Sequence, residues 1–248
     1  MSLYICKHTL VPMRMEPDHR SEMVSQILFG EYAQIIEEYK NWVKIRLEFD
    51  GYKGWVEREI PEPSPDPVQE KLIISRPLIT AGNNGQSVYI PAGAEIPLPD
   101  KGGIFRFSNQ EFHLKGRFTG PNEKITAIAG KFEYAPYLWG GRTVFGIDCS
   151  GFVQLVHKIR GITLPRDASQ QEETGMLLKS CDELREGDLM FFTNEKDSIT
   201  HVGIYLGNKR IIHASKSVRT DTVDEKGIYN KELKKYSHLL HSCKRVIF

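Results

Sequence analysis

The sequence predicts an α+β protein in which small β modules precede a larger domain that has helices first and a sheet afterwards. Short apolar runs without helical periodicity dominate residues 1–60 and again residues 68–121. A proline-rich stretch at 61–67 separates these two regions. From 122 to 248 the pattern changes to amphipathic helices followed by strands. The expected divisions are therefore a first β module, a linker, a second β module and a main domain.

The two N-terminal regions are predicted to be small barrels of short strands. In the first region the candidate strands are Tyr32–Glu37, Trp42–Leu47 and Tyr52–Val56, with a turn signal at Asp50-Gly51. In the second region they are Leu72–Ser75, Ser87–Ile90 and Phe105–Phe107, with turn signals at Gly82–Gly85 and Asp100–Gly103. Four prolines within 61–67 favour an extended, semi-rigid connector.

Helix signals open the main domain. Asn122 is expected to cap a helix that runs toward Tyr134 and stops at Pro136. The clearest helix is Ser150–Arg160, where apolar residues recur at helical spacing and Gly161 follows as a C-terminal stop. A shorter helix and three strands complete the expected order: Ser169–Thr174, then Asp188–Phe192, His201–Leu206 and Arg210–Ala214.

Composition limits the classes of function. The chain has 33 Lys and Arg against 32 Asp and Glu, and no long basic run with interleaved aromatic residues. Nucleic acid is therefore not an expected partner. No apolar run approaches the roughly 20 residues that cross a bilayer, so no membrane partner is expected either. Because the first residues lack the pattern of a secretory leader, we expect a cytoplasmic protein, or a periplasmic or secreted one if a native leader has been removed.

Cysteine spacing argues against a metal site. The four cysteines lie far apart and form no Cys-x-x-Cys pair, so no metal is predicted, and no organic cofactor is needed. Cys6, Cys181 and Cys243 are interpreted as small core hydrophobes, because free cysteine is usually buried.

Cys149 differs from the other cysteines because it stands at the expected start of a helix. Asp148 is a good N-cap residue, which places Cys149 in the first turn. Unpaired backbone N–H groups and the helix dipole favour negative charge there, so the thiol pKa would fall and an oxyanion could be stabilised. Cys149 is the candidate nucleophile, and a packed core cysteine is the alternative that the local sequence leaves open.

Two histidines on a predicted hairpin are candidate partners of this thiol. Gly207–Lys209 is interpreted as a three-residue loop that pairs Leu206 with the first residue of the next strand. His213 would then lie opposite Gly203 and diagonal to His201, with the two histidines roughly 7–8 Å apart at their roots. A nucleophile needs a base and a group that orients the base, and this pair could supply both. A two-residue turn would instead put the histidines on opposite faces, and incidental histidines are the other reading.

A set of short motifs follows in order over roughly residues 122–220. They are Pro136–Gly141 (PYLWGG), Asp148–Phe152 (DCSGF), Leu164–Arg166 (LPR), Arg185–Phe192 (REGDLMFF), His201–Gly207 (HVGIYLG) and Ile212–Ala214 (IHA). The set resembles the NlpC-type family of bacterial cell-wall cysteine peptidases. This resemblance implies a papain-like fold with a Cys–His–His triad, in which Cys149 matches the nucleophile, His201 the base and His213 the orienting residue.

The same resemblance implies a substrate pocket and a bond. Enzymes of this kind typically cleave peptides beside a γ-linked D-glutamate. The residues that match the pocket are Tyr137, Trp139, Asp148 and Ser150, with Ser169 as a looser match. Tyr137 and Trp139 could also be core aromatics, since large aromatic side chains do both jobs.

The front half of the chain carries a second resemblance. Glu31–Val56, which ends in DGYKGWV, looks like a bacterial SH3-like module. One or two such β-barrel modules before a papain-like domain resemble the γ-D-glutamyl-L-diamino acid endopeptidases of the dipeptidyl-peptidase VI type. In that subgroup the first module reads the free amine of an N-terminal L-alanine, which implies Glu22 and Tyr52 as amine contacts. A solvated surface charge at Glu22 and a core position for Tyr52 are the simpler readings.

The sequence thus predicts a cysteine endopeptidase that cleaves the γ-D-glutamyl-L-diamino acid bond of small murein peptides with an N-terminal L-Ala and releases L-Ala-D-Glu. Two alternatives stay open. One is a secreted hydrolase of intact peptidoglycan stem peptides, and the other is a non-catalytic protein that binds wall peptides.

Overall fold

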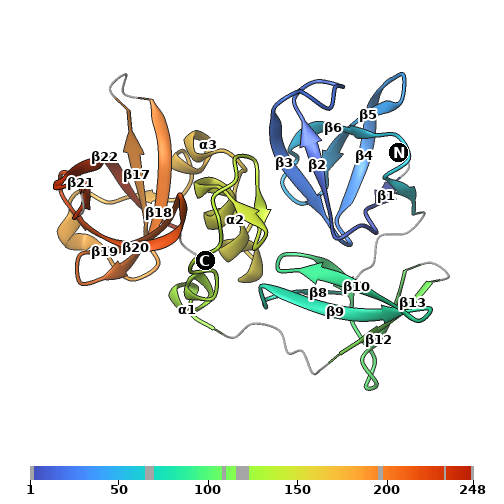
Figure 1. Ribbon diagram of the computed structural model, residues 1–248. Coiled ribbons are helices and arrows are strands. Elements are labelled where there is room, and N and C mark those ends of the chain that lie inside the picture. The colour runs from blue at the N-terminus through green and yellow to red at the C-terminus, as the bar shows by residue number, and fades with distance from the viewer. Residues whose placement is uncertain are drawn as a thin grey trace. The chain divides into compact units, whose positions relative to one another are not determined.

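The computed structural model describes residues 3–64, 70–107, 110–115, 123–194, 198–231 and 233–246. By its internal packing the chain divides into two compact units, whose elements are shown in Figure 1. The first unit comprises Met1–Pro121 with Trp139–Val144, and the second comprises Asn122–Leu138 with Phe145–Phe248. The short segment Trp139–Val144 therefore packs with the N-terminal unit, although its motif belongs to the C-terminal region.

The first sheet of the N-terminal unit has the strand order β3-β2-β6-β5-β4-β1-β7. Its strands are β1 (Leu3–Ile5), β2 (Leu10–Arg14), β3 (Met23–Leu28), β4 (Tyr32–Tyr39), β5 (Trp42–Leu47), β6 (Lys53–Glu57) and β7 (Glu62–Pro63). Alternate residues of β5 join a buried apolar cluster, because successive side chains of a strand point to opposite faces. The three strands predicted for this region are confirmed. Part of the predicted linker, Glu62–Pro63, pairs with β1, and residues 65–67 lie outside the described residues.

The second β region forms the sheet β10-β9-β13-β12 and the pair β11–β8. The strands are β8 (Lys71–Ile73), β9 (Leu78–Asn83), β10 (Gln86–Pro91), β11 (Glu95–Pro97), β12 (Ile104–Phe107) and β13 (Gln110–Leu114). Phe29, from the first region, packs with the rings of Phe105, Phe107 and Phe112 at centroid distances of 5.5–6.4 Å. The two β regions thus share one hydrophobic cluster. The predicted turn at Gly82–Gly85 is shorter than expected, because Asn83 and Gln86 already pair.

The C-terminal unit combines helices with a closed sheet. Its helices are α1 (Ile125–Gly130), α2 (Cys149–Ile159), α3 (Ala168–Glu172) and a 3-10 turn at Cys181–Glu183. Its strands are β15 (Gly146–Ile147), β16 (Met176–Leu177), β17 (Leu189–Thr193), β18 (Ile199–Gly207), β19 (Arg210–Ser215), β20 (Ser217–Asp224), β21 (Gly227–Asn230) and β22 (Lys235–Arg245), while β14 (Arg142–Thr143) belongs to the first unit. β21 pairs back onto β22, which closes strands β17–β22 into a barrel. In the described part of the chain, no helix is both long and apolar enough to cross a membrane.

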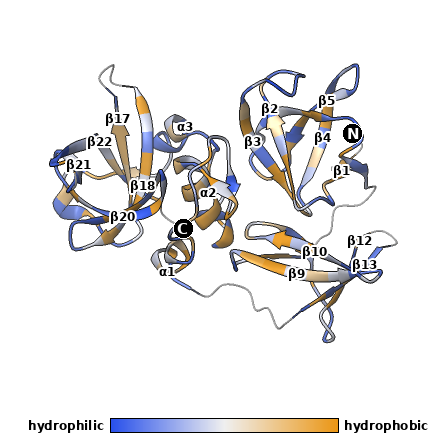
Figure 2. Cartoon of the chain, in the orientation of Figure 1, coloured by the Kyte–Doolittle hydropathy of each residue, from blue (hydrophilic) through white to orange (hydrophobic). Residues whose placement is uncertain are grey.

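The predicted helix at Ser150–Arg160 is confirmed as α2, which begins one residue earlier, at Cys149. All its residues are buried, and its largely hydrophobic colouring is visible in Figure 2. Burial on every side marks a central helix and not a surface one. The helix expected to run toward Tyr134 is shorter: α1 ends at Gly130, and its N-cap, Lys124, makes no side-chain cap. The proposed cap Asn122 lies outside the described residues.

The hairpin between β18 and β19 differs from the prediction in the length of its turn but agrees with it in the pairing of Gly203 with His213. Gly207 pairs with Arg210, so the predicted three-residue loop is wrong. Asn208 and Lys209 have φ values of 51° and 56°, as in a two-residue type I′ turn. The register slips between Tyr205 and Gly207, so the extra residue forms a β-bulge. The bulge offsets the shorter turn, and Gly203 pairs with His213 as predicted.

Candidate active site

Cys149 occupies the first turn of α2, as predicted. Asp148 is the N-cap: its Oδ1 accepts the backbone N–H of Gly151 at 2.7 Å, and its carbonyl accepts that of Phe152 at 2.9 Å. This geometry satisfies helix donors and fixes the nucleophile's backbone. The Cys149 thiol is buried and donates to the Thr200 carbonyl on β18, with a sulfur–oxygen distance of 3.9 Å. The sulfur therefore lies beside the strand that carries His201.

The two predicted histidines lie together on one face of the hairpin. His201 Nε2 and His213 Nδ1 are 2.7 Å apart, and His213 Nε2 is 3.0 Å from Asp221 Oδ2 on β20. Arg219 Nη2 donates to the other Asp221 oxygen at 2.8 Å. Both histidines are buried. The result is a continuous relay from a carboxylate through two imidazoles.

Hydrogen-bond chemistry assigns the tautomers along this relay. The Asp221 carboxylate can only accept, so His213 Nε2 carries a hydrogen and its Nδ1 offers a lone pair. His201 Nε2–H then donates to that lone pair. The remaining nitrogen of neutral His201, Nδ1, is left with its lone pair and has no hydrogen bond within the described residues. A basic nitrogen is what a thiol nucleophile requires.

Burial keeps both the thiol and this imidazole neutral. It raises the pKa of Cys149 to about 12, with a further increase from the Asp148 carboxylate, while the nearby Val202 and Ser150 N–H groups lower the pKa less. Burial also lowers the pKa of His201 well below its usual value, assisted by His213 and His238. The expectation that the helix N-terminus lowers the thiol pKa is therefore wrong for this resting structure, because desolvation outweighs the helix dipole. Within the described residues, the sulfur makes no hydrogen bond to either imidazole.

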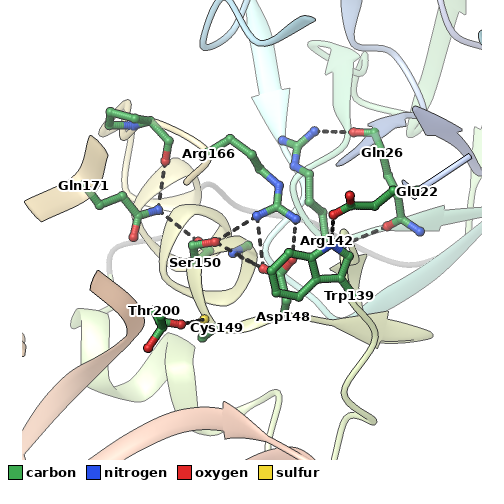
Figure 3. A network of polar contacts seen from close by, with 12 residues as sticks. Glu22, Gln26, Trp139, Arg142, Asp148, Cys149, Ser150, Arg166, Gln171 and Thr200 are labelled. Atoms are coloured by element: carbon green, nitrogen blue, oxygen red, sulfur yellow. Dashed lines mark hydrogen bonds and ion pairs between the residues drawn. The ribbon is translucent and has the colours of Figure 1, made fainter. Parts of the chain in front are cut away.

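A charged network lies behind the nucleophile. Arg166 forms a bidentate pair with Asp148, at 3.0 Å from Nη1 to Oδ1 and 2.6 Å from Nη2 to Oδ2, and Nη1 also donates to Ser150 Oγ at 2.9 Å (Figure 3). Gln171 Nε2, from α3, donates to the carbonyls of Ser150 and Pro165 at 3.0 and 2.8 Å. The buried carboxylate is thus neutralised, and the first turn of α2 is tied to α3.

Two further predicted residues of this unit differ in their placement. The Tyr137 N–H donates to the Lys216 carbonyl at 2.9 Å. Burial raises the pKa of Tyr137 to about 12, with smaller contributions from Cys149 and Asp148, so the phenol stays protonated. Ser169 is exposed on α3, and no hydrogen bond joins it to the Asp148 network within the described residues.

The N-terminal unit brings together two other predicted residues, although 117 positions separate them. The exposed Trp139 indole donates from Nε1 to Glu22 Oε1 at 2.6 Å (Figure 3). Tyr52 packs against the apolar cluster of the first β region, in line with its simpler reading. Buried Arg142 donates to Glu31 at 3.0 and 2.9 Å and to the Gln26 carbonyl at 2.6 Å. This pairing secures the Trp139–Val144 segment to the first sheet.

Sequence reasoning missed several polar residues of the site. Arg166 ended a quoted motif but received no role, and Gln171 carried no signal beyond the expected helix. Asp221 follows His213 on the next strand, and its acidic type was the available signal. His238, whose ring stacks on that of His201, lies far along the chain on β22, and local sequence gave no reason to join them.

Two family models match separate parts of the chain. A family model described as NlpC/P60 family matches residues 134–237, and one described as bacterial dipeptidyl-peptidase Sh3 domain matches residues 13–59. The gamma-D-glutamyl-L-lysine dipeptidyl-peptidase of Bacillus subtilis (strain 168) is 32% identical over 234 residues, which span 84% of this chain and 78% of the relative. Dipeptidyl-peptidase 6 of Lysinibacillus sphaericus is 28% identical, over 88% of this chain and 91% of the relative.

The fold also matches a solved structure. A crystal structure of an NlpC/P60 family protein from Bacillus cereus ATCC 10987 aligns over 100% of both chains with a TM-score of 0.85 at 20% identity. That similarity supports the fold along the whole length of the chain. The chain belongs to the NlpC/P60 family and is a cysteine peptidase with an N-terminal SH3-like domain of the bacterial dipeptidyl-peptidase type.

Proposed function

We propose that the protein cleaves the γ-D-glutamyl-L-diamino acid bond of short murein peptides that begin with a free L-alanine, and releases L-Ala-D-Glu. The observation that carries this proposal is the relay from Asp221 through His213 to His201, which leaves a basic Nδ1 on the strand that contacts the Cys149 thiol. The named activity of two relatives, gamma-D-glutamyl-L-lysine dipeptidyl-peptidase, supports the choice of bond.

The first half-reaction forms a thioester. Cys149 turns from the Thr200 carbonyl and gives its proton to His201 Nδ1 as the sulfur attacks the γ-carbonyl carbon of D-glutamate. Backbone N–H groups at the start of α2 and the protonated Tyr137 phenol stabilise the oxyanion. His201 then returns the proton to the leaving amine of the diamino acid, and the carbon–nitrogen bond breaks.

The second half-reaction releases the acyl group. Water gives a proton to His201 Nδ1, and its oxygen attacks the thioester carbon. The carbon–sulfur bond breaks, His201 returns the proton to sulfur, and L-Ala-D-Glu leaves. His213, held by Asp221, keeps the base in one tautomer throughout. No step of this reaction requires a metal or an organic cofactor.

Recognition of the free amine is assigned to Glu22 and to Tyr52, whose ring packs against the apolar cluster but is only partly buried. Glu22 is exposed, and one carboxylate oxygen accepts the Trp139 indole N–H, which orients the group. Its second oxygen has no hydrogen bond within the described residues, so it can accept one from an ammonium group. Tyr137, Asp148 and Ser150 are assigned to the pocket that binds the same substrate. Ser169 is assigned to the outer edge of that pocket. Small soluble peptides of this kind fit a cytoplasmic location.

The test uses three substrates with one readout. L-Ala-γ-D-Glu-L-Lys, its N-acetyl derivative and purified sacculi are incubated with the protein, and released L-Ala-D-Glu or wall fragments are measured by mass spectrometry. We expect cleavage of the free tripeptide, at least tenfold slower cleavage of the acetylated one, since one lost charge-assisted contact is worth about 1.5–3 kcal/mol, and no release from sacculi. Cys149→Ala should abolish turnover.

Each contrary outcome would support a different function for the protein or refute the mechanism. Release of fragments from sacculi, with equal rates on free and acetylated peptides, would support the hydrolase of intact peptidoglycan. Binding of the tripeptide without turnover would support the non-catalytic wall-peptide binding protein. Undiminished turnover by Cys149→Ala would refute the mechanism itself.

A further inference from the structure

A third imidazole lies against the base. The ring of His238, on β22, stacks on the ring of His201 with a centroid distance of 4.1 Å and an interplanar angle of 24°. It meets His213 nearly edge-on at 5.9 Å. Phe192, on β17, contacts both His201 and His238, at centroid distances of 5.9 and 6.2 Å. His238 is thus part of the ring cluster around the base, although neither the motifs nor the proposed reaction uses it.

The His238 ring is itself held in place. Ser237 Oγ donates to the Ile228 carbonyl at 3.3 Å, and the same oxygen lies 2.9 Å from His238 Nδ1. Because the hydroxyl hydrogen is directed to the carbonyl, the oxygen accepts from a His238 Nδ1–H. Backbone pairing of Ile228 with His238 anchors this arrangement in the sheet. Contacts from β21 and β22 therefore hold the His238 ring in the orientation in which it stacks on His201.

One hydrogen bond cannot fix an imidazole plane. Among the described residues, the His201 ring makes a hydrogen bond only through Nε2, to His213. Turning of the ring about its side-chain bonds would therefore move Nδ1 away from the thiol. A ring stacked at 4.1 Å blocks such rotation, because turning the plane would create overlap. The direction of the Nδ1 lone pair therefore depends on His238, and effective proton transfer depends on that direction.

The stacked imidazoles of His201 and His238 also influence each other's protonation. Two imidazolium rings in contact repel each other, so a proton on one disfavours a proton on the other. His201 faces His213 on β19 and His238 on β22. The Cys149 thiol, from α2, lies against the Thr200 carbonyl of β18, the residue before His201. His238 in turn interacts with His213 and with the Asp221 carboxylate, which is paired with Arg219. Burial, with a smaller effect of His213, lowers the pKa of His238 to about 4 although Asp221 opposes this.

We propose that His238 is a positioning residue: its stacked ring holds the plane of the His201 imidazole, and in acidic solution, once His238 itself takes up a proton, it disfavours protonation of that base. The inference rests on the proposed function only for its kinetic readout. Nothing in it requires His238 to touch the substrate.

The experiment compares His238→Phe, which keeps a stacking ring without a titratable nitrogen, with His238→Ala, which removes both. His241→Phe, at an exposed position of the same strand, is the matched control. The His201 pKa is measured in each full-length protein by NMR of ¹⁵N-labelled histidine, and kcat and KM for L-Ala-γ-D-Glu-L-Lys are measured between pH 4 and 8. Circular dichroism confirms that each variant is folded.

For His238→Phe we expect the His201 pKa, and the acid limb of kcat/KM, to move up by about half a unit or more, with kcat at pH 7.5 within about twofold of the parent. For His238→Ala we expect the same direction of shift and a kcat about tenfold or more below the parent at pH 7.5, with KM little changed. His241→Phe should match the parent.

The orienting role and the charge role of His238 can fail independently. An unchanged His201 pKa in His238→Phe would overturn the charge role, and parental kcat in His238→Ala would overturn the orienting role. If His238→Ala does not fold, a kcat for His238→Phe more than tenfold below the parent would overturn the orienting role, since the ring is kept. If the parent does not cleave the tripeptide, the proposed function fails, while the NMR titration still decides the charge role.

Discussion

Two polar networks of the C-terminal unit flank the nucleophile, and they differ in charge. The network of Asp148, Arg166 and Ser150 is a buried ion pair of a carboxylate and a guanidinium, which also donates to the Ser150 hydroxyl. The network of His201 and His213 is a row of imidazoles ending in a carboxylate, and it can move protons. The ion-pair network holds the start of α2, and with it the Cys149 sulfur, in position. The imidazole network accepts and returns the thiol proton. The difference shows how one small site separates geometry from acid–base chemistry.

The largest effect should come from breaking the charged network. Arg166→Met removes both guanidinium hydrogen bonds from the buried Asp148 carboxylate beside Cys149, which should cost about 3–5 kcal/mol of unfolding free energy. Without the guanidinium, the Asp148 carboxylate opposes thiolate formation more strongly, so kcat/KM should fall by about a hundredfold or more. Urea unfolding and tripeptide kinetics measure the two effects.

Arg142→Met is the matched control for that variant, because Arg142 forms an equally buried bidentate pair with Glu31 in the other unit. It should lose similar stability, while the pH at which Cys149 is alkylated stays unchanged. The same alkylation is measured in Arg166→Met. If both variants shift the pH dependence of Cys149 alkylation equally, the charged network beside the nucleophile has no special role.

A smaller loss should follow from reversing the tautomers of the relay. In Asp221→Asn the side-chain NH₂ can donate to His213 Nε2, so Nδ1 of His213 would carry the hydrogen and His201 Nδ1 would lose its lone pair. We expect kcat to fall about ten- to a hundredfold with little change in KM. Asp182→Asn, on the exposed 3-10 turn, is the control. Equal kcat in both variants would show that Asp221 does not set the tautomer.

Crowding the hairpin should have a more modest effect. A Cβ at Gly203 would lie 2.9 Å from His213 Cβ and 2.7 Å from Ile211 Cδ1, so His213 must shift. Gly203→Ala should lower kcat about tenfold and stability by about 1–3 kcal/mol. Gly130→Ala, where an added Cβ meets nothing within 4 Å, should change neither quantity appreciably. Parental kcat in Gly203→Ala would contradict the assigned role of His213.

The smallest effect concerns a buried histidine outside both networks. Burial lowers the pKa of His157 to about 4. The unfolded chain takes up a proton near pH 6.5, so stability is full above that pH and falls as the pH drops toward 4. His157 should contribute a loss of roughly 2 kcal/mol between pH 7.5 and pH 5. In His157→Gln the pH-dependent part of the urea unfolding free energy should shrink by that amount, and an unchanged difference would refute this assignment.

Sequence patterns predicted what is local. Helix α2, its Asp148 cap and the pairing of Gly203 with His213 follow from periodicity, capping chemistry and strand alternation. The hairpin shows the limit of this reasoning: the turn length was wrong, and an unforeseen bulge at Leu206 preserved the register. A bulge is a tertiary adjustment that carries no strong sequence signal.

What depends on burial or distant contacts could not be predicted. The raised pKa of Cys149 comes chiefly from desolvation, which no local pattern reports. His238 meets His201 only because β22 closes the barrel through β17 and β21. The Glu22–Trp139 contact was implied only as two separate matches, and folding brought them together.

The most direct test of the division between the two networks is the alkylation of Cys149 by iodoacetamide between pH 5 and 10, without substrate, followed by mass spectrometry of the peptide that contains it. A neutral thiol beside a neutral imidazole should react slowly below pH 8, with a rate that keeps rising toward pH 10. A fast plateau that begins below pH 6 would show a preformed thiolate–imidazolium pair and contradict this account.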